Sequence, residues 1–101
     1  MSLPGKKMEL NGINYHVSDQ GEGDRVALLL HGMPDTSSLW RHLVPELLGS
    51  GYRVVAPDML GYGETDKPQE AERYDGEKII GDVVGLIETL GLGQMDIVGH
   101  D

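Results

Sequence analysis

Two unbroken runs of mostly apolar residues stand out in the chain, at Val26–Leu30 and Arg53–Pro57. Such runs are typical of strands buried on both faces, as in a parallel sheet covered by helices. Met95–Val98 predicts one more short strand, which leads directly into a glycine. The pattern therefore predicts three buried strands, at the start, middle and end of the region that follows residue 25.

Apolar residues recur at helical spacing between Ser37 and Leu48. This spacing predicts a helix that packs one face on the sheet. Three residues are available to cap its start: Asp35, Thr36 and Ser37. Pro45 lies inside the segment, so we expect the helix to kink or divide near Leu43–Val44.

A second helix is predicted from Tyr74 to Leu90, closed by the glycines of Gly91–Gly93. We expect one apolar face along it. The residues expected on that face are Ile79, Ile80, Val83, Val84, Ile87 and Leu90.

Near its start the chain alternates polar and apolar residues over Lys7–Leu10 and Ile13–Ser18. Asn11-Gly12 between them predicts a two-residue hairpin turn. After the hairpin, strands and helices alternate, which favours an α/β fold with about five strands, mostly parallel, and two flanking helices. Reactive groups in such folds gather at the carboxyl ends of the strands.

Charge and composition narrow the function. The 17 acidic and 8 basic residues give a net charge of −9, which disfavours nucleic acid and anionic membranes as partners. The chain has no cysteine, and no pair of histidines has ligand spacing, so we expect no metal and no cofactor. We expect a cytoplasmic location, since no apolar stretch resembles a signal peptide or could span a bilayer.

The first buried strand is followed by His31-Gly32-Met33-Pro34. Glycine permits a sharp turn and proline cannot donate a hydrogen bond, so the Met33 N–H could face a cavity and stabilise an oxyanion. The alternative is a tight turn with no function. The loop Asp58–Pro68 lacks the third glycine of a dinucleotide fingerprint and a P-loop lysine, so we expect a shaped loop beside a pocket.

The last predicted strand ends in Gly99-His100-Asp101. A strand followed by a small residue, any residue and a nucleophile is the first half of a nucleophile elbow. In the alternative interpretation, Asp101 is an ordinary helix N-cap after a strand.

Taken together, these segments resemble the epoxide hydrolase and haloalkane dehalogenase branch of the α/β-hydrolase superfamily, from about Met8 to Asp101. The matching segments are His31–Pro34, Trp40-Arg41, Gly51–Asp58, Gly61–Pro68, Leu90–Leu92 and Val98–Asp101. The resemblance implies that Asp101 is the nucleophile and that Met33 donates to the oxyanion hole. It implies an alkyl ester on Asp101, later hydrolysed by a water that a histidine activates.

The resemblance also places the other residues. His31, Gly32 and Pro34 would support the oxyanion loop, and Gly99 and His100 would form the elbow, with His100 buried. The base histidine would follow the nucleophile, so none of the four histidines is expected to be that base. Asp58 is expected to fix a loop, and Asp35 to line the pocket or, as we favour, to cap the helix.

Epoxide and halide chemistry both fit an aspartate nucleophile. Met33 stands where many haloalkane dehalogenases carry an asparagine that holds the halide, and methionine has no such donor. Epoxide hydrolases usually have an aromatic residue there, and fluoroacetate-type dehalogenases take halide donors from later in the chain. We favour an epoxide hydrolase, and next a dehalogenase. A non-catalytic ligand-binding module is the third hypothesis.

Residues 1–101 are then expected to be the N-terminal part of a hydrolase core domain, inactive alone. The cap domain and the C-terminal half would lie outside this chain, including the cap tyrosines that assist epoxide opening. The expected partners are a small-molecule substrate and the remainder of the hydrolase. A separate chain beginning after Asp101 is one hypothesis for that remainder.

Overall fold

The computed structural model describes residues 1–100, which form a five-stranded mixed sheet in the order β1-β2-β4-β3-β5. The strands are β1 (Lys6–Leu10), β2 (Ile13–Gln20), β3 (Arg25–Leu30), β4 (Tyr52–Pro57) and β5 (Asp96–Gly99). β3 runs parallel to both β4 and β5, whereas β2 is antiparallel to β1 and β4. The predicted α/β class and number of strands are confirmed.

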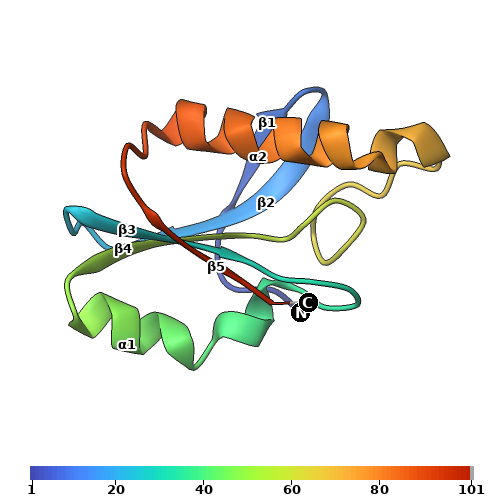
Figure 1. Cartoon of the computed structure of the whole chain (residues 1–101). Coiled ribbons are helices and arrows are strands. Elements are labelled where there is room, and N and C mark those ends of the chain that lie inside the picture. Colours follow the sequence, from blue (N-terminus) through green and yellow to red (C-terminus); the bar gives the residue numbers. More distant parts are fainter. Residues whose placement is uncertain (101) are drawn as a thin grey trace.

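Helices cover both faces of the sheet (Figure 1). The short 3-10 helix η1 (Ser37–Trp40) and α1 (Leu43–Gly49) lie on one face, and α2 (Gly76–Leu90) with η2 (Ala71–Tyr74) belongs to the other. Neighbouring residues of the central strands point to opposite faces, because side chains alternate along a strand. Leu28 therefore packs in the core beneath α2 and Leu29 in the core beneath α1, each with no exposed surface.

The hairpin turn between β1 and β2 follows from its two residues. Asn11 and Gly12 both have positive φ, 52° and 82°, as a two-residue turn of this kind requires. The turn aligns Leu10 with Ile13, and both side chains join the core beneath α2. The hairpin prediction is confirmed.

The first predicted helix is divided, as expected, but at Arg41–His42 rather than at Leu43–Val44. Pro45 explains this position, because its ring clashes with the carbonyl four residues earlier, that of Arg41, and it offers that carbonyl no N–H. Thr36 is the residue that caps η1, since its side chain accepts a hydrogen bond from the Ser38 N–H.

The predicted apolar face of α2 was partly wrong. Ile80 and Val84 are 64% and 46% exposed, whereas Leu86 and the charged Asp82 are buried. A helix turns about 100° per residue, so the stripe that contains positions 79, 82, 83, 86 and 90 turns positions 80 and 84 away from the sheet. α2 has 15 residues, and no helix in the described part of the chain is long and apolar enough to cross a membrane.

Candidate active site

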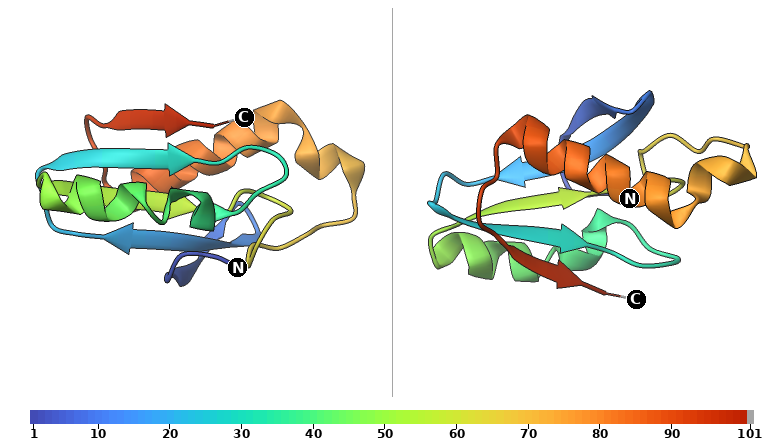
Figure 2. Two further views of the ribbon diagram at one scale, coloured as in Figure 1. Left: turned by 90° about the horizontal axis from the view of Figure 1, so that it is seen from below. Right: turned by 45° about the horizontal axis from the view of Figure 1, so that its top comes forward.

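The candidate site lies at the carboxyl ends of the neighbouring strands β3 and β5. Leu30 pairs with Gly99, and the His100 N–H donates to the Leu30 carbonyl at 3.1 Å. Because the two strands run in the same direction (Figure 2), the segments His31–Pro34 and Gly99-His100 leave the sheet side by side. Asp101, the predicted nucleophile, is outside the described residues.

The His31 ring joins two loops at this edge of the sheet. It is buried, and its Nε2 accepts a hydrogen bond from the Met59 N–H at 2.9 Å. Its Nδ1 lies 2.8 Å from the Gly32 carbonyl, to which it therefore donates. Both nitrogens of a neutral imidazole are thereby used. His31 is thus placed to support the loop that follows β3, and it has no free nitrogen for proton transfer.

The Met33 side chain projects from this loop and is 75% exposed. No backbone carbonyl among residues 1–100 accepts a hydrogen bond from the Met33 N–H. An N–H without a partner among these residues is available to a ligand, as an oxyanion donor must be. Pro34 follows it and brings no donor of its own.

Asp58, at the end of β4, is a buried carboxylate surrounded by donors. Its Oδ1 accepts from the Ser37 N–H at 2.8 Å and its Oδ2 from the Glu64 N–H at 2.9 Å and from the Ser2 hydroxyl. Burial by itself raises the pKa of Asp58, but these hydrogen bonds outweigh it and hold the pKa below its ordinary value. The side chain fastens loops, in agreement with the role expected from the sequence.

Gly63 shows why the loop after β4 contains glycine. Its φ is +55°, and a Cβ built there would stand 2.2 Å from the Asp58 Oδ2. The Thr65 hydroxyl of the same loop donates to the Asp58 carbonyl at 2.6 Å. The loop is therefore shaped by packing around a buried carboxylate, and the pocket expected beside it stays a prediction.

Replacing Asp58 with asparagine is expected to lower the free energy of unfolding by about 1–3 kcal/mol at pH 7, because an amide cannot replace the charged acceptor. The carboxylate's contribution is complete above its unfolded pKa, near 4, and is lost as the pH falls through the lower folded pKa. Urea unfolding at pH 7, 5 and 3 should therefore show a gap between wild type and variant that narrows only at acidic pH. A gap that does not change with pH would contradict this.

The burial expected of His100 in the complete hydrolase stays a prediction. Among residues 1–100 His100 is exposed, because β5 is the outer strand there and no element of these residues lies beyond it. Its ring meets the Trp40 ring edge-on, with centroids 6.4 Å apart. The favoured role of Asp35 as the helix cap was wrong, because Asp35 accepts from the Thr36 N–H at 2.8 Å and Thr36 is the cap.

The sequence patterns did not predict a buried polar cluster beneath α2. The Asp82 carboxylate accepts hydrogen bonds from Tyr15 Oη at 2.6 Å, Asn11 Nδ2 at 2.9 Å and an Arg73 nitrogen at 2.8 Å. Burial, and then the bond to Asp82, raise the pKa of Tyr15 far above its ordinary value. The only signal for this cluster is an aspartate inside an apolar helical stripe.

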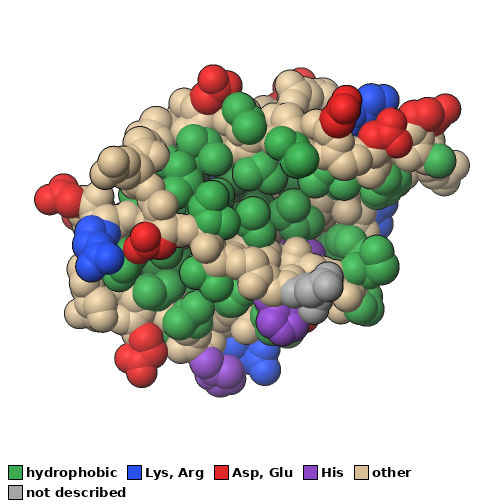
Figure 3. Space-filling model, in the orientation of Figure 1, with side chains coloured by type: hydrophobic (Ala, Val, Ile, Leu, Met, Phe, Trp, Pro, Cys, Tyr) green, Lys and Arg blue, Asp and Glu red, His purple; other side chains and the backbone are tan. Residues whose placement is uncertain are grey.

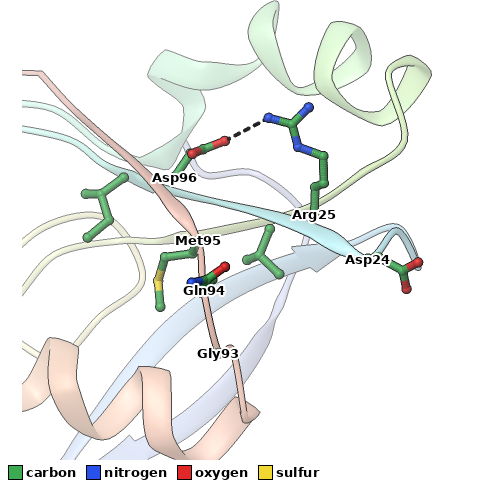
Figure 4. A pocket seen from close by; sticks show the side chains of 8 residues that line it. Asp24, Arg25, Gly93, Gln94, Met95 and Asp96 are labelled. Atoms are coloured by element: carbon green, nitrogen blue, oxygen red, sulfur yellow. Dashed lines mark hydrogen bonds and ion pairs between the residues drawn. The ribbon is translucent and has the colours of Figure 1, made fainter.

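A hollow of about 640 Å³ lies at the opposite edge of the sheet, by the amino ends of β3 and β5 (Figure 4). Arg25 and Asp96 face each other there at 3.5 Å, and both side chains are largely exposed. Gly93, Gln94 and Met95 complete that wall. An exposed ion pair of this kind is weak. Neither His31 nor Met33 lines this hollow, so we do not assign the hollow to the candidate site.

Comparisons with known proteins agree with this geometry. A family described as alpha/beta hydrolase fold matches residues 26–101. Epoxide hydrolase 2 of Siraitia grosvenorii is 47% identical over 91 residues, which are 90% of this chain and 28% of that protein. Epoxide hydrolase A of Mycobacterium tuberculosis is 39% identical over 103 residues, covering 100% of this chain and 32% of that protein.

Solved structures show the same relation. The crystal structure of an epoxide hydrolase from Vigna radiata superposes with a TM-score of 0.92 at 45% identity, over 97% of this chain and 32% of that one. The chain thus spans between 28% and 32% of the length of these three relatives.

Proposed function

Because the chain belongs to the α/β-hydrolase fold family, in its epoxide hydrolase-like branch, we propose that it carries the nucleophile and one oxyanion donor of an enzyme that hydrolyses epoxides. The observation that carries this proposal is the pairing of Leu30 with Gly99. Because of that pairing, the Met33 loop and the segment before Asp101 leave the sheet at neighbouring strand ends. The names of the relatives favour epoxides over halides, and Met33 offers no side-chain donor to a halide.

In the first step a carboxylate oxygen of Asp101 attacks one ring carbon of the epoxide. The bond between that carbon and the ring oxygen breaks, and the oxygen takes a proton from an acid to become a hydroxyl group. The product is a hydroxyalkyl ester of Asp101. A carboxylate suits this displacement at saturated carbon, whereas serine would suit acyl transfer. The acid is proposed to be supplied by tyrosines of a cap domain, outside residues 1–101.

In the second step a water, deprotonated by a histidine, attacks the carbonyl carbon of the ester. Negative charge then develops on the carbonyl oxygen, and the Met33 N–H and the N–H that follows Asp101 are proposed to stabilise it. Collapse breaks the bond between the carbonyl carbon and the alkyl oxygen, which takes the proton held by the histidine and leaves as a diol. The second proton of the water returns to the acid of the first step, which restores the Asp101 carboxylate. His31 does not serve as the base, because both of its nitrogens are engaged.

Residues 1–101 are proposed to be the first part of the hydrolase core, completed by a larger portion that contributes the base, the acid and the cap. β5 pairs only with β3 among the described residues, and hydrophobic side chains gather on the face around it (Figure 3). Ile97 of β5 is 59% exposed, and Val84 and Ile80 of α2 are 46% and 64% exposed. We propose that the remaining strands cover this surface and that residues 1–101 alone catalyse nothing.

The ester intermediate provides the direct test. The complete enzyme is mixed with a limiting amount of styrene oxide, quenched in acid within milliseconds and digested. We expect the peptide that contains Asp101 to gain the full mass of the epoxide, because ring opening expels no atom. A haloalkane would instead add its mass less hydrogen halide. If the Asp101 peptide never gains mass although diol forms, the proposed mechanism is wrong.

A further inference from the structure

The segment Met1–Gly5 contacts Asp58, at the end of β4, and the residues Thr36 and Ser37 that follow the Met33 loop. The Ser2 hydroxyl donates to the Asp58 carboxylate, which also holds the Ser37 and Glu64 N–H groups. The Leu3 N–H donates to the Ser37 Oγ at 3.0 Å. Ser37 is therefore held on both sides, by its N–H to Asp58 and by its hydroxyl to Leu3.

Two further contacts fix the same segment. The Thr36 hydroxyl donates to the Met1 carbonyl, and the His16 Nε2 donates to the Leu3 carbonyl at 2.6 Å. The Leu3 side chain is 8% exposed and packs in the core beneath α1. A Cβ on Gly5 would stand 2.3 Å from the Val17 carbonyl oxygen, so the backbone here is in close contact with β2. Met1–Gly5 is thus anchored to the core by Leu3 and Gly5.

These contacts matter for Met33 because of where they fall along the chain. Met33 lies in the short stretch between His31, fixed by the Met59 N–H, and Ser37, fixed by Asp58 and Leu3. Within this stretch Met33 and Pro34 are exposed, and Met33 is 75% exposed. The direction of the Met33 N–H is therefore set by the two fixed ends. One of those ends depends on Met1–Gly5.

We propose that Met1–Gly5 is a positioning strap for the oxyanion loop, acting through Ser2 and Leu3 on Asp58 and Ser37. The expected effect of this strap on turnover rests on the proposed function, whereas its expected effect on the Met33 loop does not. Ser2 touches no reacting atom. Its hydroxyl keeps the Asp58 carboxylate in place, and that carboxylate keeps the end of the Met33 loop in place.

The test compares three variants of the complete enzyme. Ser2→Ala removes the hydroxyl, and Ser2→Thr retains it. Ser50→Ala makes the same change at an exposed serine just beyond α1. The hydrogen bonds of Ser50 are to the last turn of α1 and not to Asp58. Hydrogen–deuterium exchange is measured on the peptides that contain residues 31–38 and 59–66, and kcat and KM are measured for styrene oxide.

In Ser2→Ala we expect about three- to tenfold faster exchange in both peptides, the effect of one lost hydrogen bond. We also expect kcat to fall by a similar factor with KM little changed, because an oxyanion donor acts in the transition state. Ser2→Thr should restore both quantities, and Ser50→Ala should match the wild type. A merely structural contact would lower stability without this selective loss of kcat.

Exchange and turnover separate the two proposals. If Ser2→Ala exchanges as slowly as wild type in residues 31–38, the strap is refuted even if styrene oxide is hydrolysed. If exchange rises in Ser2→Ala but kcat stays at the wild-type value, then Met1–Gly5 does not position the Met33 N–H for catalysis, and the proposed strap is refuted. If the wild-type enzyme hydrolyses no epoxide while exchange rises in Ser2→Ala and recovers in Ser2→Thr, the proposed function fails and the strap stands as a support for the loop.

Discussion

Changing Asp101 to asparagine in the complete enzyme should lower kcat for an epoxide by about 10⁴-fold or more, the scale seen when a covalent nucleophile is removed. The amide oxygen carries no negative charge and attacks a ring carbon poorly, so the ester of the first step does not form. The side chain keeps nearly the same shape, and the strand before it should be unaffected. The rate of diol formation, measured by chromatography, gives kcat for the variant and the wild type.

Asp96→Asn is the matched control. Asp96 begins β5, the strand that precedes Asp101 in the sequence, and its carboxylate accepts hydrogen bonds from Tyr52 and Arg25 at the amino ends of the strands. We expect that variant to retain wild-type kcat. An Asp101→Asn enzyme within tenfold of wild type would show that another group is the nucleophile.

Replacing Asp82 with alanine should lower the free energy of unfolding by about 3–5 kcal/mol, the cost of leaving a buried charge without its partner. Only 1% of the Asp82 side chain and 16% of the Arg73 side chain are exposed, so little water can reach the guanidinium once the carboxylate is gone. The Tyr15 hydroxyl would lose its acceptor too. Denaturation in urea, monitored by circular dichroism, measures the change.

Glu88→Ala provides the control on the same helix, because Glu88 is exposed and an ordinary surface change costs less than about 0.5 kcal/mol. A second comparison adds Arg73→Met to Asp82→Ala. Removing the charge should recover part of the loss, so the double variant should be more stable than Asp82→Ala alone. If Asp82→Ala unfolds within 1 kcal/mol of wild type, the ion pair contributes far less than its burial indicates.

Local sequence patterns were enough to predict most of the fold. Asn11-Gly12 predicted its hairpin because only certain residues tolerate two successive positive φ angles. Pro45 predicted a divided helix because its ring excludes one hydrogen bond. The oxyanion and elbow segments could be found because a strand end followed by glycine is a local feature, although their roles remain predictions.

Contacts between distant parts of the chain were not predictable in this way. Ser2 and Asp58 are 56 positions apart, and neither residue signals the other. Asp82 reads as a polar interruption of an apolar stripe until Arg73 and Tyr15 are seen around it. The exposure of His100 among residues 1–100 follows from their strand order, which places β5 at the edge, and periodicity does not determine that order.

The edge-on contact between His100 and Trp40 gives the chain an optical reporter. Trp40 is the only tryptophan in the sequence, and its ring is 7% exposed. In residues 1–101 the emission therefore comes from a single indole in a largely dry environment, next to an imidazole that immediately precedes Asp101 in the sequence. Fluorescence intensity would thus register changes in the position of the residue beside the proposed nucleophile, with no added label.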